Sequence, residues 1–172
     1  MRPSSFHRPA ALAALLLAFS GGAMAQSQAA QSGTPAGQEW WRGHPYTWAS
    51  VGTTFAYGQT YGSANVGVGW LMRQGIAPNV ELGYAFGNTP AVWTVRPGVS
   101  WYLPIAVIRP YVGAYFTHWF VSDGYPDQNG VGARAGLSLG RVLALGVTYD
   151  HALGCSQNCD SWAPQISAGY AF

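Results

Sequence analysis

Two cysteines, Cys155 and Cys159, are the only thiols in the sequence, and their types and spacing allow either a disulfide or part of a metal site. Structural zinc sites need four ligands at recognisable spacings. His151 and Asp160 flank the pair, but the spacing matches no such pattern. Because the chain carries an export leader, described below, oxidation is favoured. We therefore expect a Cys155–Cys159 disulfide that pins a loop, and neither a metal nor a cofactor.

Two histidines raise the alternative of a catalytic site. His118 and His151 fall near the same end of two predicted strands, where a lipid-modifying enzyme would need a histidine that activates a serine nucleophile. Ser156 and Ser161 lie near His151 in sequence, but no His-x-Ser pair is present. We therefore predict no catalytic residues and no enzyme activity, with lipid modification kept as an alternative.

Three acidic residues fall in predicted loops: Asp123, Asp127 and Asp160. They could weakly bind divalent cations that bridge lipopolysaccharide molecules. Their Asp-Gly and Pro-Asp contexts favour a simpler role as turn formers.

The segments that would position these residues alternate with a period of two, which is typical of strands. In segment 79–87, large apolar residues at even positions alternate with small or polar residues at odd positions. Eight segments follow the pattern, each about as long as a tilted membrane-spanning strand. They are residues 46–58, 62–72, 78–87, 91–103, 107–120, 130–140, 142–151 and 162–172.

Five charged residues fall on the small-residue face of these segments: Glu81, Arg96, Arg109, Arg134 and Asp150. Only the fifth segment has an ambiguous facing, and Gly113 favours the phase in which Arg109, Tyr111, Tyr115 and Thr117 share that face. Buried ions need partners. We therefore predict that the five residues form an ion-pair network inside a narrow barrel.

The composition explains why the large apolar face should point outward. Of 172 residues, 8% are charged, 49% are hydrophobic and 15% are aromatic. Soluble domains carry about a quarter charged residues, so a water-exposed surface is a poor fit. The abundance of aromatics opposes disorder. A closed, apolar-out, polar-in barrel satisfies its strand edges in hydrocarbon. The sequence therefore predicts an all-β, eight-stranded antiparallel up-and-down transmembrane barrel over residues 46–172.

The first 25 residues are typical of a secretory signal peptide. Arg2 and Arg8 precede an apolar run, and Ala23-Met24-Ala25 offers a cleavage site. Without these two arginines, six Arg balance six acidic residues, so the formal net charge is zero and no basic patch for nucleic acid remains. Residues 26–45 are mainly polar and small, which predicts a flexible periplasmic segment.

Aromatic residues gather near the strand ends, as expected at the two membrane interfaces. The predicted girdles comprise Trp48, Trp70 and Trp101 at the periplasmic end, and Tyr57, Trp93, Tyr149 and Trp162 at the outer end.

Two motifs and the eight-strand pattern carry a family resemblance. The chain ends in Ile-Ser-Ala-Gly-Tyr-Ala-Phe, and Arg-Pro-Tyr-Val-Gly-Ala at 109–114 looks like a strand start common among small barrels. With these features the sequence resembles small Gram-negative outer-membrane β-barrel proteins of the OmpX and OmpA transmembrane-domain type. The resemblance implies an outer-membrane location, and recognition of Tyr170 and Phe172 by the barrel-assembly machinery after escort by periplasmic chaperones. It does not imply one activity.

The expected function is structural or surface-interacting, with a side-chain-filled lumen. The expected surroundings are outer-membrane lipids and lipopolysaccharide, with no nucleic acid, and the protein is expected to be a monomer. Only two of the predicted outer loops are longer than a tight turn, at about 121–129 and 152–161, which argues against a large adhesin. One alternative is a narrow channel for small or hydrophobic solutes, as in OmpW-type barrels. The other is a lipid A-modifying enzyme, although the His-x-Ser pair of the PagL deacylase family is missing.

Overall fold

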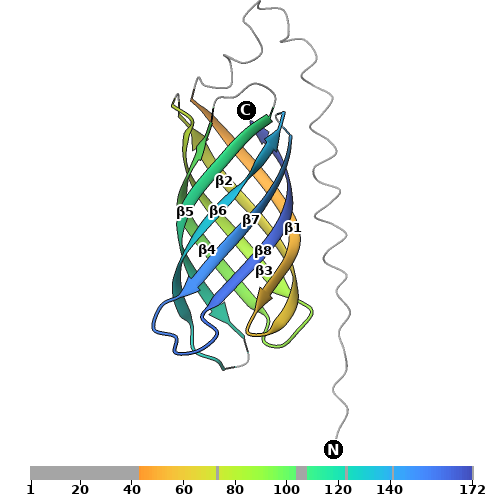
Figure 1. The fold of residues 1–172 in the computed structure, drawn as a ribbon, viewed down its shortest axis with the longest axis vertical. Coiled ribbons are helices and arrows are strands. Elements are labelled where there is room, and N and C mark those ends of the chain that lie inside the picture. Colours follow the sequence, from red (N-terminus) through yellow and green to blue (C-terminus); the bar gives the residue numbers. More distant parts are fainter. Residues whose placement is uncertain (1–42, 73, 104–107, 123, 141, 172) are drawn as a thin grey trace, which may run out of the picture. The chain divides into compact units, whose positions relative to one another are not determined.

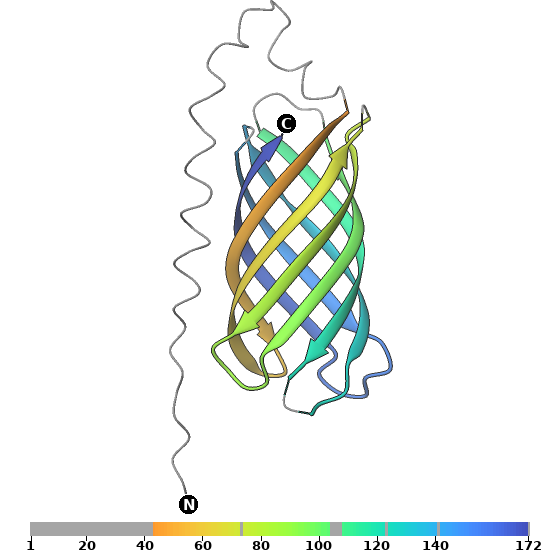
Figure 2. The same ribbon diagram turned by 180° about the vertical axis from the view of Figure 1, so that it is seen from behind.

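Eight antiparallel strands form a closed barrel in the computed structural model, which describes residues 43–72, 74–103, 108–122, 124–140 and 142–171 (Figure 1, Figure 2). Each strand pairs with its neighbours in sequence, and β1 pairs with β8 to close the sheet. The strands are β1 (His44–Ala56), β2 (Gln59–Leu71), β3 (Ile76–Phe86), β4 (Val92–Tyr102), β5 (Ile108–Val121), β6 (Gln128–Leu139), β7 (Leu143–Ala152) and β8 (Asp160–Ala171). The predicted all-β fold is confirmed.

The predicted strand boundaries lie within three residues of those observed. The predicted signal peptide, most of the predicted flexible segment 26–45, Asp123 and Phe172 lie outside the described residues, as does the side chain of Tyr170. Among the residues that the structure describes, no helix is long and apolar enough to span a bilayer.

The turn between β1 and β2 is tighter than predicted. The predicted segments 46–58 and 62–72 leave residues 59–61 between them, but β2 already begins at Gln59, and only Tyr57 and Gly58 form the turn. Both have positive φ, 53° and 71°, as a two-residue hairpin turn matched to strand twist requires. Glycine adopts this conformation easily, whereas tyrosine rarely does. The sequence therefore signalled the turn at Gly58 but not its first residue.

Burial alternates along the strands, so the barrel has a packed interior and an apolar outer wall. In β5, Tyr111, Tyr115 and Thr117 are buried, while Val112 and Phe116 are exposed. The fifth strand therefore has the predicted phase. Interiors of eight-stranded barrels are just wide enough for side chains to fill.

The two ends of the barrel differ. The connections 122–127 and 153–159 lie at one end, together with the β1–β2 turn, and we call this the loop end (bottom of Figure 1). The start of β1 and the end of β8 lie at the opposite, termini end. Trp70 and Trp101 occupy the outer wall near the termini end, and Trp93, Tyr149 and Trp162 occupy it near the loop end.

Trp48 corrects the predicted girdle, because its side chain points into the lumen. Ser50 is buried and Val51 is exposed, which fixes the phase of β1 and places Trp48 on the inner face. The Trp48 indole lies over Gly67 on β2, where a Cβ atom would collide with it. The sequence did not reveal this phase because both faces of β1 mix small, polar and aromatic residues.

Candidate functional site

Four charged side chains meet inside the barrel at mid-height. Glu81 on β3 is fully buried and accepts from two guanidinium groups. Arg96 Nη1 on β4 lies 3.0 Å from Glu81 Oε1, and Arg134 Nη1 on β6 lies 3.3 Å from Glu81 Oε2. Arg96 Nη2 also reaches Asp150 Oδ2 on β7, at 3.4 Å. We call these four residues the central charge cluster; two cations and two anions make it electrically neutral.

Aromatic and amide groups brace the central charge cluster. Both guanidinium groups make cation–π contacts with the Tyr115 ring, with Arg96 Cζ 5.7 Å and Arg134 Cζ 4.6 Å from the ring centroid. Trp48 Nε1 donates to Glu81 Oε2 at 3.2 Å, and Arg96 Nη1 donates to Asn65 Oδ1 at 3.3 Å. Charges in a low-dielectric interior are stabilised only when their hydrogen-bonding capacity is met, and these contacts meet part of it.

Arg109, the fifth residue of the predicted network, is buried but lies nearer the termini end. Its Cα pairs with Ser138 on β6, and its Nη1 donates to the carbonyl oxygen of Gly140 at 3.3 Å. The structure therefore brings four of the five predicted residues into the central charge cluster and places Arg109 on the termini side of them.

An aromatic cluster in the lumen on the termini side was not anticipated as a unit. Tyr46 stacks on Trp48 with centroids 5.2 Å apart, and Tyr102 links Tyr46 to Tyr111 at 6.4 and 5.3 Å. Leu71 is also buried and faces inward here. A cavity of about 80 Å³ lies among these side chains. The alternating pattern placed Tyr111 inside, but finding the cluster required the phase of β1.

A larger cavity lies on the loop side of the central charge cluster. It measures about 300 Å³ and is bounded by Arg96 at its deep end and by Tyr125 and Cys159 of the connections at the loop end. Tyr57 lines it and donates to Gln128 Oε1 at 2.8 Å. Partial burial raises the pKa of the Tyr57 phenol, so it keeps its proton at neutral pH. We call this cavity the vestibule.

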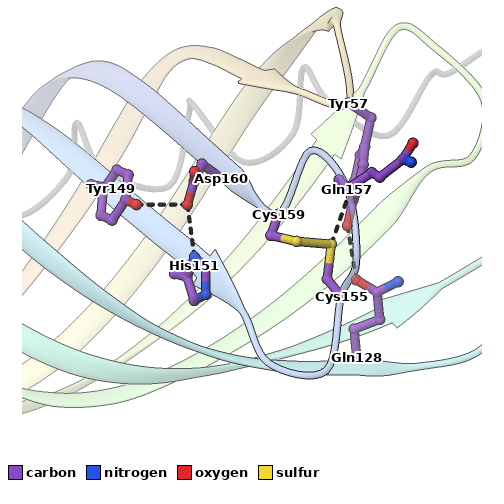
Figure 3. Close-up of a disulfide and its surroundings, with 8 residues drawn as sticks. All are labelled: Tyr57, Gln128, Tyr149, His151, Cys155, Gln157, Cys159 and Asp160. Atoms are coloured by element: carbon purple, nitrogen blue, oxygen red, sulfur yellow. Dashed lines mark hydrogen bonds and ion pairs between the residues drawn. A yellow bond between two sulfur atoms is a disulfide. The ribbon is translucent and has the colours of Figure 1, made fainter.

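The predicted disulfide is confirmed. Cys155 and Cys159 are bonded, and they close the connection between β7 and β8 over a separation of four residues (Figure 3). Their Cα atoms lie 5.5 Å apart, an ordinary separation for a disulfide. Because Cys159 directly precedes β8, the bond holds the loop against the strand end.

Histidine and acidic side chains meet on the outer face at the loop end. His151 Nδ1 lies 2.7 Å from Asp160 Oδ1, and the Tyr149 hydroxyl donates to the same oxygen at 2.6 Å (Figure 3). The register explains the contact, because His151 on β7 is paired directly with Asp160 on β8. Ser161 shares the inward phase of Ala163 and Gln165 in β8, so this candidate nucleophile is on the other face of the wall.

The second histidine pairs differently. His118 Nδ1 lies 2.7 Å from Asn129 Oδ1, and its Nε2 lies 4.0 Å from Asp127 Oδ2. Asp127 also accepts from the backbone N–H of Val121 at 3.2 Å, as expected of an acidic loop former. Within the described ranges, no group of three or more His, Cys, Asp or Glu side chains could hold a metal ion.

Comparison with known proteins supports the fold rather than an activity. No protein-family model and no curated protein matches the chain. Neisserial surface protein A is 14% identical with a TM-score of 0.58, and the match covers 76% of this chain and 97% of that one. The N-terminal β-barrel domain of Pseudomonas aeruginosa OprF is 15% identical, with a TM-score of 0.58 and coverage of 76% and 100%.

The outer membrane enzyme PagL is also similar in structure, at 16% identity and a TM-score of 0.51, with coverage of 74% and 99%. Since likeness at this level of identity shows the fold alone, it does not separate enzymes from other barrels. The chain has the fold of small eight-stranded outer-membrane β-barrels.

Proposed function

We propose that this protein is a non-conducting, non-catalytic barrel of the outer membrane, with a role that is structural or exercised through its loop-end surface. It is exported by a cleaved leader, escorted by periplasmic chaperones, inserted by the barrel-assembly machinery, and resides as a monomer among lipids and lipopolysaccharide. The observation that carries the proposal is the filled lumen. The exposed apolar outer wall supports the location, because such a surface suits lipid better than water.

Two successive barriers fill the lumen. The central charge cluster joins four strands around Glu81, so a passing ion would have to break ion pairs that are shielded from water. On the termini side of the central charge cluster, the aromatic cluster narrows the lumen around a cavity of about 80 Å³. These barriers weigh against the channel alternative, because a solute would have to displace both.

The purified barrel in a planar lipid bilayer is expected to leave the membrane conductance at its baseline. Folding and insertion are verified beforehand by the different gel mobilities of unheated and boiled samples. A general porin, whose lumen is a water-filled channel, is the positive control. Steady ion conductance that changes when Glu81 or Arg96 is replaced would contradict the proposal and favour a narrow channel.

A lipid-modifying enzyme is the second candidate, favoured by the His151–Asp160 pair. With Asp160 accepting from Nδ1–H, the imidazole Nε2 could take a proton from water. The water oxygen would then attack an ester carbonyl carbon, the ester C–O bond would break, and the leaving alkoxide would receive the proton. The pair is on the outer face at the loop end, where lipid headgroups would lie. The similarity to the fold of PagL is compatible with this chemistry.

Lipid A from cells that express the protein distinguishes the two functions. Our proposal expects a mass spectrum identical to that of cells carrying an empty vector. Loss of an acyl chain that disappears with His151→Ala, but persists with His118→Ala, would establish the enzyme and refute the non-catalytic role. The His118 variant is a matched control because that ring also lies on the outer wall of the barrel and contacts an amide, Asn129.

A further inference from the structure

We propose that the vestibule is a binding pocket for a small uncharged molecule that has an aromatic or apolar body and one oxygen-bearing head group. This inference goes beyond the structural role proposed above and holds whether or not the lumen conducts ions. It rests on the shape of the vestibule, on polar atoms at its floor that have no partner within the protein, and on the charge balance beneath them.

The floor of the vestibule carries three unpartnered polar atoms. Ser63 Oγ, Thr94 Oγ1 and Arg96 Nε are buried without a hydrogen-bond partner among the described residues. All three residues line the vestibule, and they are only 6%, 5% and 8% exposed. Buried polar atoms are nearly always satisfied by protein or water, and three of the seven exceptions among the described residues belong to side chains that line the vestibule. Together they offer three donors and two hydroxyl acceptors, which suits a carbonyl or hydroxyl oxygen.

A glycine next to the floor makes room for the polar side chains of the neighbouring strands. A Cβ atom at Gly83 on β3 would collide with Asn65 Oδ1 and Thr94 Oγ1, and it would lie 3.3 Å from Arg96 Nη1. The polar groups of β2 and β4 therefore come together in the space that a larger side chain at position 83 would take. This arrangement sets polar groups at the deep end of the vestibule, where the head of a ligand would sit.

The aromatic walls of the vestibule favour a ligand with an apolar body, and the charge balance at its floor favours an uncharged one. Tyr61 and Trp119 face inward from β2 and β5 and supply aromatic surface, while Tyr57 and Tyr125 stand nearer the connections. Ligand pockets combine such apolar walls with a few placed polar groups, and 300 Å³ is at the small end of their size range. The central charge cluster at the deep end of the vestibule has two cations and two anions, so the floor has no net charge to compensate a charged ligand.

The test uses benzamide as the probe, with the barrel in lipid nanodiscs and isotope labels on Trp119 and Gly83. We expect saturable chemical-shift changes of the Trp119 indole N–H and the Gly83 amide. Thr94→Val should weaken the affinity by roughly two- to tenfold, because one hydrogen bond is lost. The melting temperature should stay the same or rise, since the replaced hydroxyl has no protein partner.

Thr117→Val is the matched control, because Thr117 Oγ1 is also buried and unpartnered in the lumen but does not line the vestibule. It should leave the affinity unchanged. If Thr94→Val does not fold, Ser63→Ala tests the same floor. Shifts that never saturate, or an affinity indifferent to both floor variants, would show partition into lipid only and overturn the pocket. Tighter binding of benzoate than of benzamide would overturn the uncharged class.

Discussion

Replacing Glu81 with alanine is expected to lower the free energy of unfolding by about 3–5 kcal/mol, the cost of breaking a buried ion pair by removing one partner. Glu81 is fully buried and forms ion pairs with both Arg96 and Arg134. The other anion of the cluster, Asp150, pairs only with Arg96 among the ion pairs described. Without Glu81, the cluster would hold two cations and one anion inside the barrel. Urea-induced unfolding in lipid vesicles, followed by tryptophan fluorescence, measures the change.

Asp160→Ala is the control for Glu81→Ala, because it removes an acid whose side chain is 59% exposed and which faces a histidine. Exposed pairs contribute about 0–1 kcal/mol, so the control should stay within that range. Adding Arg134→Ala to the Glu81 variant should cost less than Arg134→Ala alone, since it removes an uncompensated cation. Equal losses for Glu81 and Asp160, or strictly additive effects, would contradict the central charge cluster as a stabilising unit.

The second large effect concerns the outer wall. Val147→Arg should reduce the free energy of unfolding in lipid by about 2–4 kcal/mol, because a cation would face hydrocarbon near the bilayer midplane. Val147 lies midway along β7, its side chain points outward, and its neighbours across the strands are Ala135 and Pro164. The same unfolding titration in vesicles provides the measurement.

The control for this prediction is the same substitution placed away from the bilayer midplane. Leu153→Arg places the same cation in the connection after β7, where the residue is exposed and the cost should fall to about 0–1 kcal/mol. Val147→Leu keeps the position apolar and should cost less still. If Val147→Arg is as stable as Leu153→Arg, the outer wall does not face hydrocarbon and the membrane assignment fails.

The alternation of large apolar and small residues predicted which side chains of most strands point into the barrel. This pattern is informative because a shift of one residue would turn every side chain of a strand to the wrong face. The strands β3, β6 and β7 contain clear contrasts between glycine or charge and large apolar residues, so their facing followed from the sequence. β1 lacks that contrast. Trp48 was therefore assigned to the outer wall, although it donates to Glu81 in the lumen. The interior aromatic cluster was missed for the same reason.

Contacts between strands depend on register, which a sequence pattern determines less well than facing. The phase of each strand placed Arg109 in the lumen correctly, but only the register shows that it lies on the termini side of the central charge cluster. The pairing of His151 with Asp160 depends likewise on the length and path of the connection that carries the disulfide. The vestibule could not be predicted, because its floor combines unpartnered atoms from separate strands.

The central charge cluster also bears on the order in which the protein can fold. Arg134 and Glu81 are 53 residues apart in sequence, and Arg96 and Asp150 are 54 apart, so the pairs join hairpins from different halves of the barrel. A partly assembled sheet would expose single charges of these pairs to the bilayer, at a free-energy cost that closure removes. Insertion of incomplete sheets is thereby penalised, which favours closing the barrel in one cooperative step.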